Sequence, residues 1–149
     1  MRSVDLTKIL FVEDSEEDFL TVKRAFKQAG VKNSIYRVKT GDEALDYLFN
    51  KGKYESEDDY PKPALILLDL NLPGLSGRDV LQALKKDSSL KKIPVIILTT
   101  SNDEKDVDAC YRDGANSYMQ KPVEFQGFVE AISRLQDYWF EISILPKEL

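Results

Sequence analysis

Short apolar runs alternate with amphipathic stretches along the chain, and this alternation restricts the fold more than any other feature. Five segments have the length and composition of strands: Ile9–Val12, Ser34–Lys39, Leu65–Leu68, Val95–Leu98 and Ser117–Gln120. Helical spacing predicts helices over Glu16–Ala29, Asp42–Phe49, Arg78–Lys86, Asp103–Asp113 and Glu124–Tyr138. The length of 149 residues suits one domain. The alternation predicts an α/β fold, with a doubly wound, five-stranded parallel sheet and five helices that cover both of its faces.

Three of the apolar runs end in oxygen-bearing side chains. Glu13 and Asp14 follow the first run, Asp69 follows "ALILL", and Thr99 follows "VIIL". Because ligands of such sheets bind at the carboxyl ends of the strands, we expect these side chains to share one site with Lys121, which follows the fifth run. An ionised carboxylate is costly to bury, so Asp69 should lie where a cation neutralises it.

The residue types at these strand ends indicate phosphoryl chemistry. Asp14 and Asp69, with Glu13 behind them, offer hard oxygen ligands of the kind that Mg²⁺ prefers. Lys121 and the Thr99 hydroxyl supply a cation and a donor for a phosphoryl oxygen. Aspartate carboxylates can act as nucleophiles and form aspartyl-phosphates. The residues alone therefore predict a cleft that accepts a phosphoryl group on an aspartate with the help of magnesium.

Composition excludes several other functions. The chain has no histidine, which rules out Ser-His-Asp and Cys-His catalysis and a His-ligated zinc site within it. The formal charge of -5 argues against a nucleic acid or an anionic membrane as partner. No apolar run approaches the roughly 18 residues of a membrane span. With no secretory signal and with Cys110 as the single cysteine, we expect a cytoplasmic protein.

Four motifs in order resemble those of the receiver domain of two-component response regulators. They are "FVEDS", "LLDLNLPGLSG", "ILTTS" and "YMQKP", and the resemblance covers residues 7 to about 140. It implies the flavodoxin-like strand order 2-1-3-4-5 and a single receiver domain over 1–149, with 141–149 as a C-terminal tail. The long acidic loop and the "YWFEISILP" tail resemble the small regulators that serve cyanobacterial phytochromes.

The resemblance implies a phosphoacceptor and its metal ligands. Asp69 would accept the phosphoryl group. Mg²⁺ would be held by Asp14, Asp69 and the backbone carbonyl of Asn71, with Glu13 reaching it through water. Asn71 and Ser101 occupy positions that vary within the family and tune the lifetime of the phosphate.

The resemblance also implies a switch. Lys121 would contact the phosphoryl oxygens, and a cis peptide before Pro122 would aim it inward. Thr99 would move toward the phosphate, and Tyr118 would rotate into the vacated space. Phosphorylation would thus change a protein-interaction surface, in a signalling protein rather than an enzyme.

The expected partners are proteins. A sensor histidine kinase, suspected to be phytochrome-like, would supply the phosphohistidine that this chain lacks. A homodimer is expected through the C-terminal helix and tail, because large apolar residues crowd the end of the sequence: Tyr138, Trp139, Phe140, Ile142, Ile144 and Leu145. The alternatives are a tail that folds back over its own domain and a surface that docks the kinase.

Plainer interpretations exist for single residues. Asp14 could cap the helix that follows it, although Ser15 could do so instead. Thr99 could be an ordinary strand residue and Tyr118 an ordinary core residue. Lys121 could be a solvated strand end. The segment "NKGKYESEDDYPKP" is expected to be a solvated surface loop.

Three other classes of protein fit the sequence less well. A phosphotransferase of the haloacid-dehalogenase type needs a second aspartate two residues after the first, where Asn71 stands. An FMN carrier of flavodoxin type needs a Ser/Thr/Gly-rich loop after the first strand, where "EDSEED" is acidic. A receiver-like domain that is never phosphorylated would not need the complete acidic set.

Overall fold

The computed structural model describes residues 4–28, 33–100, 103–121, 126–127 and 130. Its five strands are β1 (Val4–Val12), β2 (Ser34–Val38), β3 (Lys62–Asp69), β4 (Val95–Thr99) and β5 (Ser117–Gln120). All neighbouring strands are parallel, in the order β2-β1-β3-β4-β5. The α/β class, the strand count and the strand order are therefore confirmed.

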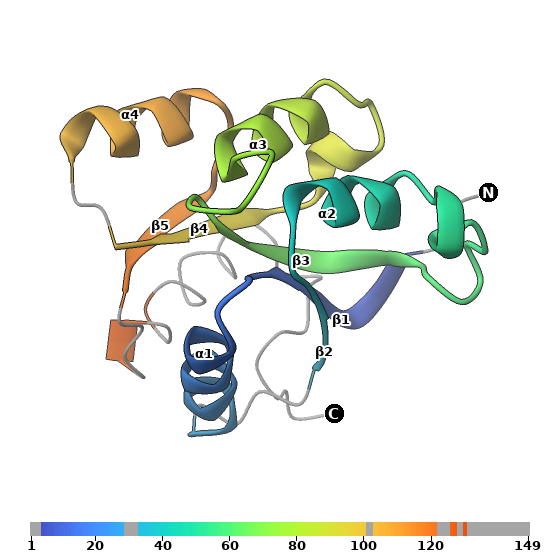
Figure 1. Ribbon diagram of the computed structural model, residues 1–149, viewed down its shortest axis with the longest axis horizontal. Coiled ribbons are helices and arrows are strands. Elements are labelled where there is room, and N and C mark those ends of the chain that lie inside the picture. Colours follow the sequence, from blue (N-terminus) through green and yellow to red (C-terminus); the bar gives the residue numbers. More distant parts are fainter. Residues whose placement is uncertain (1–3, 29–32, 101–102, 122–125, 128–129, 131–149) are drawn as a thin grey trace.

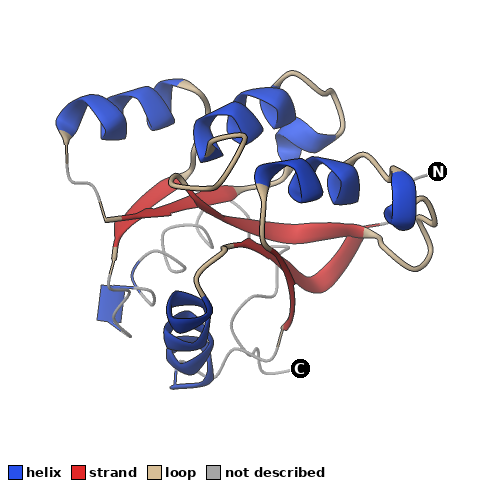
Figure 2. Cartoon of the chain, in the orientation of Figure 1, coloured by secondary structure: helices blue, strands red, loops and turns tan. Residues whose placement is uncertain are grey.

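Helices cover both faces of the sheet (Figures 1 and 2). They are α1 (Glu16–Gln28), α2 (Gly41–Leu48), α3 (Gly77–Lys85) and α4 (Glu104–Arg112), with short 3₁₀ helices η1 (Gly52–Tyr54) and η2 (Leu90–Lys92). In Figure 1, α2, α3 and α4 lie on one side of the sheet and α1 lies on the other. The predicted helix over Glu124–Tyr138 falls outside the described residues, apart from three positions. No helix in the described part of the chain is long and apolar enough to cross a bilayer.

The middle parts of the central strands are unbroken apolar runs because both faces of these strands are buried. In β1, Leu10 and Val12 belong to the core beneath α2 and α3, whereas Ile9 and Phe11 belong to the core against α1. Successive side chains of a strand point to opposite faces, so a strand covered on both sides needs an unbroken apolar run. Cys110 of α4 is buried in the first of these cores, as a small apolar residue would be.

Two strands begin earlier than their apolar runs predict. β1 begins at Val4 and β3 begins at Lys62, and these two residues pair across the sheet. The register shifts between Asp5 and Ile9, so the first part of the ladder is irregular. These extensions contain polar residues, so no apolar run in the sequence predicts them. They are strands because they pair with each other.

The acidic loop after α2 is only partly solvated, so that prediction is wrong for its tyrosines. Tyr54 is 1% exposed, although the loop's acidic side chains face solvent. Its ring lies 4.8 to 6.0 Å, between centroids, from the rings of Tyr36, Tyr47 and Tyr60. Lys62 is buried as well, and its Nζ donates to the Leu48 carbonyl at 2.6 Å. Burial of the large aromatic rings is favourable enough to pack this part of the loop against the core, although most other residues of the loop are polar.

A Tyr54→Phe substitution tests this cluster through pH. Burial raises the pKa of Glu43, but the hydrogen bond that the Tyr54 hydroxyl donates to its Oε2 at 2.6 Å helps to hold that pKa below its ordinary value. A carboxyl group with a lowered pKa stabilises the fold above its unfolded pKa and loses this contribution as the pH falls. Tyr54→Phe should therefore lower the free energy of unfolding by about 1 kcal/mol at neutral pH, and by less in acid.

The measurement is thermal unfolding of both proteins at neutral and acidic pH. Tyr60→Phe is the matched control, since within the described part of the chain the Tyr60 hydroxyl makes no hydrogen bond, although its ring belongs to the same cluster. A Tyr54→Phe defect that is equally large at both pH values would contradict the role given to Glu43.

Candidate functional site

The side chains of interest gather where the parallel strands end. Asp69 is the last residue of β3 and Thr99 is the last residue of β4. Asp69 pairs with Leu98, and Thr99 pairs with Gln120, the residue before Lys121. The register of the sheet thus places these strand ends side by side, as expected for the carboxyl edge of such a fold.

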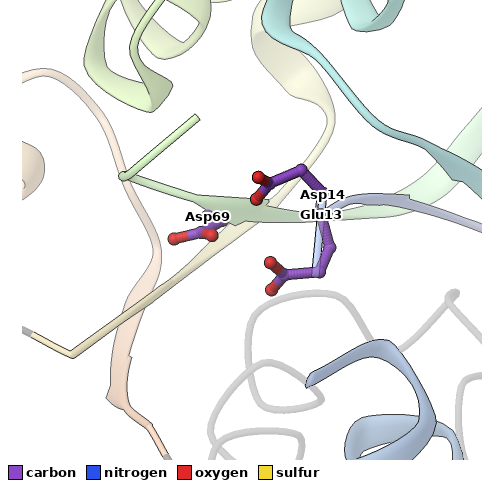
Figure 3. Close-up of side chains that lie close together, drawn as sticks. All are labelled: Glu13, Asp14 and Asp69. Carbon is purple, nitrogen blue, oxygen red and sulfur yellow. The ribbon is translucent and has the colours of Figure 1, made fainter. Parts of the chain in front are cut away.

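Three carboxylates form a cluster at this edge (Figure 3). One oxygen from each of Glu13, Asp14 and Asp69 lies within 4.8 Å of the others. Glu13 is completely buried and Asp69 is 3% exposed, whereas Asp14 is exposed. The donor set consists of oxygen alone, which suits a hard divalent cation such as Mg²⁺ or Mn²⁺.

Opposing effects act on the pKa of Glu13. Burial raises the pKa of Glu13 to about 7, and the neighbouring carboxylate of Asp69 adds to this effect, while the ion pair with Lys121 opposes it. Negative charge is therefore held at this edge against a strong desolvation cost. A bound divalent cation would relieve that cost.

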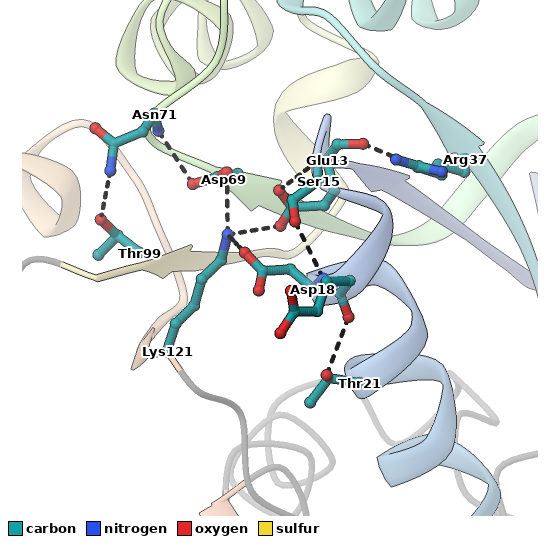
Figure 4. A network of polar contacts seen from close by, with 10 residues as sticks. Glu13, Ser15, Asp18, Thr21, Arg37, Asp69, Asn71, Thr99 and Lys121 are labelled. Atoms are coloured by element: carbon teal, nitrogen blue, oxygen red, sulfur yellow. Dashed lines mark hydrogen bonds and ion pairs between the residues drawn. The ribbon is translucent and has the colours of Figure 1, made fainter.

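Lys121 is the cationic centre of the site (Figure 4). Its Nζ lies 2.7 Å from Glu13 Oε1, 2.8 Å from Asp18 Oδ2 and 3.1 Å from Asp69 Oδ2. Burial alone would lower the pKa of Lys121, but its hydrogen bonds to Asp18 and Glu13 and the negative charges of Asp69 and Glu13 raise it above its ordinary value. The lysine is 9% exposed and stays charged, so it is not a solvated strand end.

Asp18 is a contact residue that the sequence analysis missed. It lies in the first turn of α1, beside Glu16 and Glu17, and all three are acidic. Only its position on the helix distinguishes it, because Asp18 lies one turn before the buried Val22 and therefore on the side that faces the sheet. The spacing between Asp18 and Val22 is the one feature of the sequence that could have indicated this contact.

Arg37 is a second missed residue, and it supports the turn between β1 and α1. Its Nε donates to the Glu13 carbonyl at 2.9 Å, and a terminal nitrogen lies 2.6 Å from Glu16 Oε1. The guanidinium also lies over the ring of Phe19, 4.9 Å from its centroid. The sequence suggested only that this residue belonged to the predicted strand Ser34–Lys39.

Capping of α1 is done by Ser15, which leaves Asp14 for another role. The Ser15 Oγ accepts a hydrogen bond from the Asp18 N–H at 3.2 Å. The alternative that Asp14 serves as the helix cap is therefore not supported. The carboxylate of Asp14 faces the other acids of the cluster instead (Figure 3).

The remaining predicted residues occupy the rim and the core. Asn71 donates its backbone N–H to Asp69 Oδ1 at 3.0 Å and its side-chain amide to Thr99 Oγ1 at 3.4 Å. Tyr118, on β5, is half-buried against the core beneath α2 and α3. Pro122, its predicted cis peptide and Ser101 lie outside the described residues.

Gly77 lets α3 begin directly against the end of β3. A Cβ at this position would lie 2.2 Å from the carbonyl oxygen of Asp69, which is backbone and cannot move aside cheaply. Gly77 N–H also donates to the Leu70 carbonyl at 3.0 Å. The close approach of the two backbones therefore requires glycine at this position.

Gly77→Ala should lower the free energy of unfolding by about 1–3 kcal/mol through overpacking. Urea denaturation is the measurement. Gly52→Ala is the control, because a Cβ there meets nothing within 4 Å, and only its positive φ of 59° should cost stability, about 1 kcal/mol. A Gly77→Ala protein as stable as the parent would show that the two elements pack less closely than described.

Known proteins share this fold. Residues 9–133 match the family described as the response regulator receiver domain. Response regulator Rcp1 of Synechocystis sp. (strain ATCC 27184 / PCC 6803 / Kazusa) is 38% identical over 138 residues, covering 93% of this chain and 92% of Rcp1. The solved Mn(2+)-bound form of Rcp1 has a TM-score of 0.75 at 37% identity, with 95% of this chain and 99% of that chain covered.

Two further solved structures are similar over nearly the whole chain. The bacteriophytochrome response regulator RtBRR has a TM-score of 0.81 at 38% identity, covering 97% of this chain and 82% of that chain. The phosphorylated cyanobacterial phytochrome response regulator RcpA has a TM-score of 0.75 at 36% identity, covering 95% and 99%. By its matched residues and by its fold, this chain belongs to the family of response regulator receiver domains.

Proposed function

We propose that this chain is a response regulator that accepts a phosphoryl group on Asp69, with Mg²⁺, from a sensor histidine kinase. The observation that carries the proposal is the position of Asp69. Its carboxylate ends a buried strand, lies 3.1 Å from the Lys121 ammonium, and shares a cluster with two other acids. A buried carboxylate that lies beside a cation and belongs to a cluster of acids able to hold a metal is equipped as a nucleophile toward phosphorus.

The transfer itself requires one bond to form and one to break. An Asp69 carboxylate oxygen would bond to phosphorus while the bond from phosphorus to a histidine nitrogen of the kinase breaks. Since this chain contains no histidine, the donor must come from the partner. Lys121 would then offset part of the roughly two negative charges of the aspartyl-phosphate.

Magnesium is the proposed cofactor. Asp14, Asp69 and the backbone carbonyl of Asn71 would hold it, with Glu13 reaching it through water. The observed cluster fits, because its donors are all oxygens within 4.8 Å of one another. Bound Mg²⁺ would supply charge neutralisation to the phosphoryl oxygens. Rcp1 has been solved with Mn(2+), a cation that favours the same kind of ligand.

A phytochrome-type kinase is the proposed source of the signal. The names of RtBRR and RcpA associate those similar regulators with bacteriophytochrome and with cyanobacterial phytochrome. Thr99 and Tyr118 would pass the change at Asp69 to a protein-binding surface. The homodimer through the C-terminal helix and tail remains a prediction from the sequence, since those residues lie outside the described part.

Incubation with acetyl phosphate tests the proposed function without the kinase. With Mg²⁺ present, intact-mass spectrometry should show the gain of one phosphoryl group, and peptide mapping should place it on Asp69. Addition of a chelator before the donor should prevent the gain. A parent protein that stays unlabelled with Mg²⁺ at saturation would overturn the proposal.

Asp14→Ala should weaken Mg²⁺ binding by at least about tenfold, because it removes a charged ligand from the cluster. The side chain is exposed, so the fold should be retained. Titration calorimetry measures the affinity. Glu17→Gln is the control, since it removes the same charge from an exposed position outside the cluster. Equal affinities in the Asp14→Ala variant and the parent would contradict the ligand assignment.

A further inference from the structure

We infer that Asp18 is a positioning residue for Lys121, which holds the lysine ammonium in place while Asp69 is released to attack the phosphoryl donor. The inference rests on the proposed function, because it concerns the same transfer. Asp18 would thereby increase the rate of phosphoryl uptake, although it touches neither the donor nor the metal.

The geometry makes Asp18 an independent partner of Lys121. Its Oδ2 lies 2.8 Å from Lys121 Nζ, closer than the 3.1 Å that separates this nitrogen from Asp69 Oδ2. Asp18 belongs to α1, whereas Asp69 ends β3, so the lysine is held between two elements (Figure 4). Asp18 is not one of the three acids that could hold a metal.

Both carboxylate oxygens of Asp69 accept a hydrogen bond before the reaction. Its Oδ1 accepts the N–H of Asn71 at 3.0 Å, and its Oδ2 accepts from Lys121 at 3.1 Å. One of these oxygens must turn its lone pair toward phosphorus for the new bond to form. When Oδ2 is the attacking atom, Lys121 must loosen its contact with Asp69.

Such a release is costly unless Lys121 keeps other partners. The lysine side chain is only 9% exposed, and a buried ammonium without a carboxylate is strongly unfavourable. Glu13 is the nearest partner, at 2.7 Å, but it also belongs to the metal cluster. Asp18 is therefore the carboxylate that Lys121 need not share with a metal. It keeps the ammonium charged and beside Asp69 throughout the transfer.

Asp18→Asn should slow the initial rate of labelling by acetyl phosphate about tenfold. The amide replaces the carboxylate, so the charge-assisted hydrogen bond to Lys121 is lost and Lys121 then holds Asp69 more tightly. The loss of a negative charge by itself would favour the approach of an anionic donor and act in the opposite direction. Glu17→Gln, one position away and exposed, removes the same charge without a contact to Lys121. It should label as fast as the parent or slightly faster.

Asp18→Glu should recover most of the parent rate, since the carboxylate is restored on a helix that is open to solvent at this position. A merely structural role would instead appear as a lower melting temperature, with labelling rates unchanged well below it. Calorimetry should find the same Mg²⁺ affinity in Asp18→Asn as in the parent.

The outcomes separate the inference from the function on which it rests. A parent that takes up no phosphoryl group overturns the proposed function. A parent labelled on Asp69, beside an Asp18→Asn variant of equal or greater rate, overturns only the role of Asp18. Equal slowing in Asp18→Asn and Glu17→Gln, or an Asp18→Glu variant as slow as Asp18→Asn, also overturns it.

Discussion

The Asp69→Asn protein is expected to fold and to take up no phosphoryl group from acetyl phosphate. An amide has nearly the shape of the carboxylate but is not a nucleophile toward phosphorus. The fold should survive because Lys121 keeps its ion pairs with Glu13 and Asp18 at 2.7 and 2.8 Å, so that no buried charge loses all of its partners. We therefore expect labelling to be abolished and the free energy of unfolding to change little.

Intact-mass spectrometry after incubation with acetyl phosphate and Mg²⁺ measures this loss. Asp46→Asn is a suitable control, since it makes the same chemical change at an exposed position on α2. It should label as the parent does. Undiminished labelling of Asp69→Asn would remove Asp69 from the role of phosphoacceptor, whatever the rest of the site does.

Lys121→Met should produce the largest loss of stability of any single change at the site. The substitution leaves Glu13 and Asp69 buried without the cation that they share, and it removes the partner of Asp18. Removing one member of a buried ion pair typically costs about 3–5 kcal/mol of unfolding free energy. A saturating concentration of Mg²⁺ should restore part of this loss, because a ligand that binds only the folded state stabilises it.

Urea denaturation with and without Mg²⁺ measures both effects. Lys53→Met is the control, since Lys53 pairs with Glu43 at 3.4 Å while its own side chain is 69% exposed. An exposed pair of this kind contributes less than about 1 kcal/mol. If Lys121→Met proves no less stable than Lys53→Met, the three carboxylates do not depend on the lysine in the way that the distances indicate.

The sequence was sufficient for the central part of the fold. β3 and β4 lie between helical layers, so each contains an unbroken apolar run that is visible in the sequence. Because the carboxyl ends of parallel strands lie at one edge of the sheet, the sequence alone assigns the residues at those ends to one site. Asp69, Thr99 and Lys121 lie together for this reason.

Features that depend on the partner element could not be predicted in the same way. The early parts of β1 and β3 are strands because Val4 and Lys62 pair with each other, and neither segment has an apolar pattern of its own. Tyr54 is buried because three other rings surround it, in a loop whose composition indicates solvent. In both cases a contact distant in sequence outweighs the local preference.

The sequence by itself determined which residue types stand at the strand ends, and hence an oxygen-rich site with one lysine. Only the tertiary structure decided that Glu13 is buried while the adjacent Asp14 is exposed, and that Asp18 rather than Glu16 or Glu17 reaches Lys121. The physical reason is orientation. Adjacent acids look alike in a sequence, but the path of the strand end and the rotation of α1 about its axis direct one inward and another to solvent.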